Sequence, residues 1–165
     1  MSSEKKQLNF ILEANDGTLV TVEQDVAYQS NLIKKMAEDL GFEVCGTSET
    51  LPVSNIDGWT LQKIVDWCTA HRGEIFVPKG EHEDPRIELT KADKEYLDMS
   101  TDRLVDVLLG ANYLDIQGLI EIITQQIANF AIGKSVQELR DFYGLENDFT
   151  PEEEEELRKR FKWVE

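Results

Sequence analysis

Apolar and polar residues alternate near the start of the chain with the two-residue period of a β-strand. The alternation runs mostly through residues 8–13 and again through residues 18–23, which are rich in β-branched side chains. Between them stands Asn15-Asp16-Gly17, a turn sequence whose glycine adopts a positive φ without steric cost. The pattern therefore predicts a β-hairpin over residues 8–23.

Two helical segments and a short strand follow the hairpin. Ser30 is a good helix N-cap, and apolar residues then recur at helical spacing until Gly41. Residues 51–53, Leu-Pro-Val, favour a short strand that the proline confines to a sheet edge or a strand start. A second helix, ended by Gly73, has apolar residues at i, i+3, i+4 and i+7: Leu61, Ile64, Val65 and Cys68.

A polar segment with a proline at each end, residues 78–85, separates this half from a helical second half. Ser100 or Thr101 begins a helix whose residues 104–111 are apolar nearly all round, which predicts burial on most of its sides. Another apolar stripe spans residues 119–131. A capping box at Ser135-Val136-Gln137-Glu138 begins a short helix that Gly144 ends.

The C-terminal segment carries a complete set of helix-start signals. Thr150 is an N-cap, Pro151 occupies the first helical position, and Glu153 completes a second capping box. The next three glutamates each stand four residues before a cation, so three i, i+4 ion pairs are expected. This helix has few apolar residues, and Trp163 near its end either packs on a neighbouring helix or anchors a bound partner.

The charge of the chain narrows the classes of partner. Lys and Arg number 17 against 33 Asp and Glu, which gives a formal charge of −16. Such a surface repels phosphate backbones, so no nucleic-acid partner is expected and a basic protein surface is the better match.

No apolar run approaches the roughly 20 residues of a membrane span, and the first residues lack the apolar stretch of a signal peptide. We therefore expect a soluble intracellular protein with no membrane partner.

The residues that catalysis or metal binding needs are sparse. Cys68 and His71 would lie on adjacent positions of one helix, but Cys68 falls in the apolar stripe, which indicates a buried thiol beside a surface histidine. Zinc needs three or four ligands, and the chain offers only four candidates of the preferred kinds, without ligand spacing: Cys45, Cys68, His71 and His82. There is no glycine-rich phosphate loop. We expect no catalytic residue, cofactor or metal, which leaves a binding module.

Two stretches are distinctive in combination. The first is residues 111–119, Ala-Asn-Tyr-Leu-Asp-Ile-Gln-Gly-Leu, and the second is residues 147–154, Asn-Asp-Phe-Thr-Pro-Glu-Glu-Glu, which leads to Arg158-Lys159 and Trp163. Shorter supporting matches are Asp16-Gly17, Glu38-Asp39-Leu40-Gly41, Trp67-Cys68-Thr69 and Ile132-Gly133-Lys134. In this order, the set resembles the S-phase-kinase-associated (Skp) adaptor family of SCF ubiquitin ligases.

The resemblance implies an α+β fold. A BTB/POZ domain, a small N-terminal β-sheet packed with α-helices, would cover residues 7–132, and two C-terminal helices would extend it over residues 133–165. It further implies a non-catalytic adaptor of the cytoplasm and nucleus that bridges a cullin scaffold to F-box substrate receptors. Ubiquitin transfer itself would belong to a separate RING-bound conjugating enzyme.

The family's binding residues carry over to matching positions. Asn112 and Tyr113 match the pair that faces the cullin; the alternative for Tyr113, which is less favoured, is a core residue at a helix end. The receptor-facing positions, on the C-terminal helices and the last BTB/POZ helices, match Leu104, Leu108, Ile120, Ile127, Phe149 and Trp163. Pro151 matches a position that is hydroxylated and glycosylated in some protist members, but its place at the first turn of a helix already accounts for it.

Other functions are compatible with the same fold. A structural subunit of a chromosomal or kinetochore complex stays open, although Asn112 and Tyr113 favour the cullin route. An elongin-C-like role is disfavoured because that family lacks the tail from Ser135 onward. Homodimerisation is one way to cover an apolar groove that holds no receptor.

The chain also departs from the family pattern at two places. Residues 77–85 replace the acidic, proline-rich loop of the family. Gly110 replaces a usual alanine, which destabilises a helix interior by roughly 1 kcal/mol.

Overall fold

The computed structural model describes residues 9–41, 50–74, 76 and 89–161. It divides into two compact units, residues 1–128 and residues 129–165. The predicted polar segment at residues 78–85 and the predicted binding residue Trp163 lie outside the described residues.

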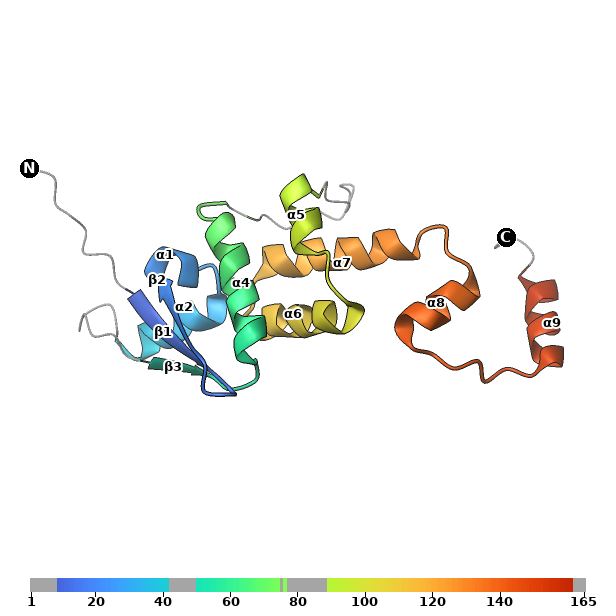
Figure 1. Ribbon diagram of the computed structural model, residues 1–165, viewed down its shortest axis with the longest axis horizontal. Helices are drawn as coiled ribbons and strands as arrows, with labels where there is room; N and C mark the ends of the chain where they lie inside the picture. The colour runs from blue at the N-terminus through green and yellow to red at the C-terminus, as the bar shows by residue number, and fades with distance from the viewer. Residues whose placement is uncertain (1–8, 42–49, 75, 77–88, 162–165) are drawn as a thin grey trace, which may run out of the picture. The chain divides into compact units, whose positions relative to one another are not determined.

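A small sheet begins the first unit (Figure 1). Strand β1 (Asn9–Ala14) pairs antiparallel with β2 (Leu19–Glu23) and parallel with β3 (Thr50–Val53), so the strand order is β2-β1-β3. Gly17 has a φ of 81° in the turn between β1 and β2, the conformation for which the turn sequence is suited. The predicted hairpin is confirmed, and so is the short edge strand, on which Pro52 is exposed.

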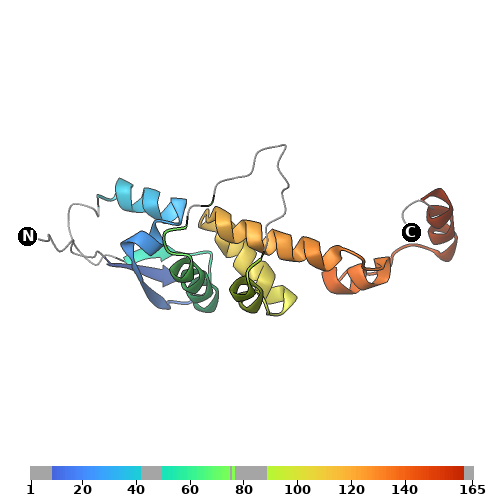
Figure 2. The same cartoon turned by 90° about the horizontal axis from the view of Figure 1, so that it is seen from above.

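Helices cover the sheet and complete the first unit (Figure 1 and Figure 2). Helix α4 contacts β1 and β2 and packs against α6. Helix α1 was not expected from the apolar pattern, because a single turn contains too few apolar positions to set a period. The helices of this part are α1 (Gln24–Ala27), α2 (Asn31–Asp39), α4 (Gly58–Ala70), α5 (Lys91–Tyr96), α6 (Thr101–Tyr113) and α7 (Gln117–Ala131), the last of which continues into the second unit.

Gly110 lets α6 approach α4 closely. A Cβ atom at this position would lie 2.7 Å from Ile64 Cδ1 and 3.2 Å from Thr60 Cγ2, and all three residues are buried. A distance of 2.7 Å is well inside the usual contact distance between carbon atoms. The glycine that is unfavourable for the helix on its own is therefore explained by the packing of two helices.

Ser30 joins the N-terminus of α2 to the C-terminus of α6. Its hydroxyl accepts a hydrogen bond from the Ile33 N–H at 3.1 Å and donates one to the Leu114 carbonyl at 2.5 Å. Beside it, the Asn31 side chain donates to Asp115 Oδ2 at 3.0 Å, where Asp115 itself has a positive φ of 53°. Because Ser30 is buried, water cannot replace its hydroxyl at either helix end.

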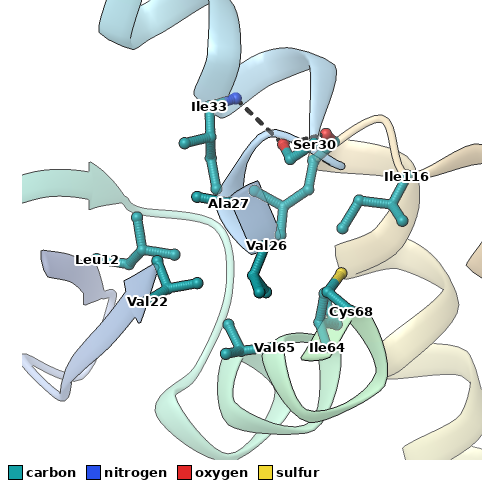
Figure 3. Close-up of a pocket in the computed structure, with 11 residues that line it drawn as sticks. Leu12, Val22, Val26, Ala27, Ser30, Ile33, Ile64, Val65, Cys68 and Ile116 are labelled. Carbon is teal, nitrogen blue, oxygen red and sulfur yellow. Dashed lines mark hydrogen bonds between the residues drawn. The ribbon is translucent and has the colours of Figure 1, made fainter. Parts of the chain in front are cut away.

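A small cavity lies beside Ser30, among side chains of the sheet and the surrounding helices (Figure 3). Its volume is about 10 Å³, and its lining is apolar apart from the hydroxyl of Ser30 and the thiol of Cys68. A space of this size holds at most one water molecule. We therefore interpret it as a packing void and not as a ligand site.

The second unit contains α8 (Val136–Tyr143) and α9 (Pro151–Arg160). Each begins with the predicted capping box, in which a hydroxyl and a glutamate satisfy each other's backbone N–H groups: Ser135 with Glu138, and Thr150 with Glu153. The rings of Phe130 and Phe142 stack with their centroids 3.8 Å apart. Local hydrogen bonding and aromatic contacts thus define much of this unit, since none of its described residues is buried.

We expect Ser30→Ala to lower the free energy of unfolding by about 2 kcal/mol, because it leaves the Ile33 N–H without its capping partner and leaves the buried Leu114 carbonyl with the longer hydrogen bond from the Leu32 N–H, at 3.4 Å. The control is Ser100→Ala, since Ser100 is the N-cap of α6 but makes no side-chain capping bond. We expect this control to change stability by less than about 0.5 kcal/mol. Urea denaturation measures both, and equal effects of the two substitutions would contradict the role assigned to Ser30.

The capping boxes predict how the second unit responds to acid. Hydrogen bonds from the backbone and hydroxyl of Ser135 lower the pKa of Glu138, and those of Thr150 lower the pKa of Glu153. A carboxylate with a depressed folded-state pKa contributes stability above its unfolded pKa of about 4.3, and that contribution is lost as the pH falls through the folded-state value. Carbon-13 NMR titration of the side-chain carboxyls measures both pKa values. We expect Ser135→Ala to raise the pKa of Glu138 alone; an unchanged value would contradict the capping interaction.

Candidate binding surfaces

The predicted cullin-binding pair lies at the end of α6 that Ser30 holds. Asn112 is exposed, whereas Tyr113 is half-buried and packs against the core of the first unit. Leu114, which follows them, is 1% exposed, and its carbonyl is the group that accepts the hydrogen bond from Ser30. The two side chains are therefore presented from a helix end whose position is fixed. Tyr113 packs against the core and is also partly exposed at the surface.

Tyr113 borders a surface pocket of about 260 Å³, which we call the Tyr113 pocket. Its apolar lining includes Ile56 and Leu109, and its polar lining includes Asp57 and Asp106. Leu109 is 62% exposed, although the sequence pattern predicted burial of α6 on most sides. That prediction is wrong for Leu109 and for Val105, which is 40% exposed, because no described element covers this side of the helix.

Asp57, on the rim of the Tyr113 pocket, is ionised at neutral pH. Burial acts to raise the pKa of Asp57, but hydrogen bonds from Thr60 and the nearby charge of Arg103 outweigh it, so that the pKa lies below its usual range. Arg103 Nη1 lies 3.9 Å from Asp57 Oδ2 and 3.4 Å from Asp106 Oδ2. An apolar side chain flanked by basic groups is the complementary ligand for such a surface.

The predicted receptor-binding residues fall into both units. Leu104 is only 6% exposed and belongs to the core, and the half-buried residues Leu108, Ile120 and Ile127 pack against that core. Phe149 belongs to the second unit and is 46% exposed. The four residues of the first unit thus already make intramolecular contacts, whereas Phe149 presents much of its ring to solvent.

The second unit exposes further apolar side chains that are not among the predicted receptor-binding residues. They are Ile132, Val136, Tyr143, Leu145, Leu157 and Phe161. Two of these, Val136 and Leu157, line a pocket of about 350 Å³ together with Phe149, and we call this the tail pocket. The available signal was their presence in and beside two short helices too polar to bury a core of their own.

Cys68 and His71 are the two residues that the sequence offered for catalysis. Cys68 is 4% exposed, and burial raises its pKa to about 12, so the predicted buried thiol is confirmed. The expected surface position of His71 is wrong: its side chain is 15% exposed, with Nδ1 3.0 Å from the Trp67 carbonyl and Nε2 3.1 Å from Asp93 Oδ1. Its imidazole therefore connects α4 to α5.

Metal and membrane sites were searched over the same part of the chain. Within it, no group of three or more His, Cys, Asp or Glu side chains is arranged to hold a metal ion, and Cys45 and His82 fall outside it. No described helix is both long enough and apolar enough to span a bilayer.

Comparison with known proteins gives the family. Residues 9–73 match the Skp1 family tetramerisation domain, a POZ domain, and residues 117–164 match the Skp1 family dimerisation domain. Together with the three-stranded sheet and its helices, these matches confirm the predicted BTB/POZ-type α+β fold with C-terminal helices.

Curated relatives match nearly the whole chain. The protein named E3 ubiquitin ligase complex SCF subunit sconC of Aspergillus terreus is 37% identical over 157 residues, which cover 94% of this chain and 95% of that protein. The protein of the same name from Aspergillus flavus is 38% identical over 154 residues, covering 92% and 93%, and that of Arthroderma benhamiae is 36% identical over 157 residues, covering 93% of each. The resemblance drawn from the two sequence stretches is thereby confirmed, and the chain belongs to the Skp1 family.

Proposed function

We propose that this chain is a non-catalytic adaptor subunit of an SCF-type ubiquitin ligase, which bridges a cullin scaffold to F-box substrate receptors. The observation that carries the proposal is that each unit exposes an apolar surface of its own: the Tyr113 pocket in the first and the tail pocket in the second. Its relatives are named as SCF subunits, which agrees with this role.

The cullin binds the first unit through Asn112 and Tyr113. Tyrosine offers a rigid apolar ring with a polar tip, and asparagine offers both a donor and an acceptor, so the pair suits a protein contact. Leu109 extends the apolar part of this surface, and the carboxylates of Asp57 and Asp106 favour a partner with basic groups nearby.

The F-box receptor binds the C-terminal extension, residues 133–165, and the last helices of the BTB/POZ domain, residues 7–132. Phe149 and its exposed apolar neighbours in the second unit supply contacts that require no rearrangement of a core. Ile120 and Ile127 lie two helical turns apart on α7 and are half-buried, so part of each side chain is accessible to an amphipathic helix. Leu104, Leu108 and Trp163 complete the proposed contact set.

Two further properties are expected of this adaptor. In the absence of a receptor, a second copy of the chain covers the exposed apolar residues, so the free protein forms a homodimer. Its place of action is the cytoplasm and the nucleus.

The bridge predicts a selective loss of one partner. We expect a pull-down with the wild-type chain to recover a cullin and several F-box proteins, and Asn112→Ala/Tyr113→Ala to recover the F-box proteins without the cullin. The control is Glu38→Ala/Leu40→Ala, which alters one polar and one apolar residue, both exposed at the end of α2. Mass spectrometry identifies the recovered proteins. Recovery of F-box proteins but no cullin by the wild type would contradict the ligase role and favour the structural subunit of another complex.

The absence of catalysis predicts an inert thiol. A Cys45→Ser variant carries Cys68 as its single thiol, and we expect iodoacetamide at neutral pH to modify it only after unfolding in urea. Burial and the raised pKa leave almost no accessible thiolate in the folded protein. Intact-mass spectrometry measures the modified fraction. Rapid modification of the native protein would contradict this and would reopen a thiol-dependent reaction.

A further inference from the structure

In the second unit, the carboxylate of Glu154 connects α9 to α8. Glu154 Oε1 accepts hydrogen bonds from Arg140 Nη1 on α8, at 3.3 Å, and from Asn147 Nδ2 in the loop that follows, at 2.8 Å. Within the described residues, the side-chain hydrogen bonds from residues 136–147 to α9 both end on this one oxygen. The sequence had paired Glu154 with Arg158, so this connection is visible only in the structure.

The Glu154 contacts are more sheltered than an ordinary surface ion pair. The side chains of Arg140 and Glu154 are 15% and 29% exposed, whereas those of the neighbouring pair Lys159 and Glu155 are 67% and 69% exposed. Hydrogen bonds from Asn147 and Arg140 lower the pKa of Glu154, so it stays ionised at neutral pH. Shelter from water and salt makes such a contact stronger than its exposed counterpart.

The same residues fix Phe149. Asn147 donates to Glu154 with its amide nitrogen, and its amide oxygen accepts from the Phe149 N–H at 3.2 Å. The guanidinium of Arg140 lies 5.8 Å from the centroid of the Phe149 ring. Phe149, Arg140, Asn147 and Glu154 all line the tail pocket, so one network determines both the loop conformation and the pocket wall.

We infer that Glu154 is a positioning residue for receptor binding: it holds Phe149 and α9 in the receptor-binding arrangement before the receptor arrives. This inference rests on the proposed function, because it assigns the tail pocket to the F-box partner. A binding site that exists in only a fraction of molecules binds with an affinity reduced by that fraction. Without the Glu154 carboxylate, α9 and the loop sample other arrangements, and the receptor must select the competent one.

The test compares two glutamates of the same helix. Glu154→Ala removes the network, whereas Glu156→Ala removes an exposed glutamate two residues away and serves as the control for charge and helix content. The probe is the isolated F-box domain of a receptor recovered with the wild-type chain, immobilised for surface plasmon resonance. We expect Glu154→Ala to raise the Kd about tenfold, as loss of hydrogen bonds to one charged group would, and Glu156→Ala to change it less than twofold.

Two further measurements separate positioning from direct contact. In the free protein, we expect amide hydrogen exchange of residues 145–157 to be faster in Glu154→Ala than in Glu156→Ala, and in the complex we expect equal exchange. We also expect Arg140→Glu or Glu154→Arg alone to weaken binding, and the double charge exchange to restore part of it, since the ion pair is reformed with opposite polarity.

The outcomes distinguish this inference from the proposed function. Wild-type protein that binds no F-box domain would overturn both. F-box binding that is equally tight for wild type, Glu154→Ala and Glu156→Ala would overturn the positioning role alone. Weaker binding by Glu154→Ala with unchanged exchange in the free protein would also overturn it, because Glu154 would then be a direct contact.

Discussion

The arrangement of the first unit depends on the buried hydroxyl of Ser30. A helix leaves N–H groups unpaired at its start and carbonyl groups unpaired at its end, and both kinds are unfavourable without a partner. A hydroxyl is the smallest side-chain group that accepts and donates together, and here it serves the start of α2 and the end of α6. Asn112 and Tyr113 directly precede the carbonyl that it binds, so the surface proposed for the cullin inherits its position from this contact.

The two proposed binding surfaces are supported in different ways. The Tyr113 pocket is formed by elements that share a large apolar core, so its shape follows from packing. The tail pocket belongs to a unit in which residues 129–161 include no buried side chain, and hydrogen bonds and aromatic contacts define the structure there. Regions with few buried contacts open most easily. The surface proposed for the receptor is therefore expected to open more easily than the surface proposed for the cullin, which makes the sheltered contacts of Glu154 the more important for it.

Much of the fold was predictable because the relevant signals are local. The hairpin turn, the caps at Ser30, Ser135 and Thr150, and the helix-ending glycines each act within a few residues. The predictions that failed concern contacts between distant segments. Leu109 is apolar in the sequence whether or not another helix covers it, and Glu154 faces a cation four residues ahead even though Asn147 and Arg140 bind it instead. His71 likewise depends on Asp93, which lies 22 positions away.

The close approach of α4 and α6 couples the choice of residue at two distant positions. Alanine is the better helix former at position 110, but the space that its methyl group needs is filled by Ile64 Cδ1, the far end of a side chain that can rotate. An alanine here therefore requires Ile64 to change rotamer, whereas a valine at position 64 would lack the methyl group in question. The effect of a substitution at position 110 thus depends on the residue at position 64, and the two changes are not additive.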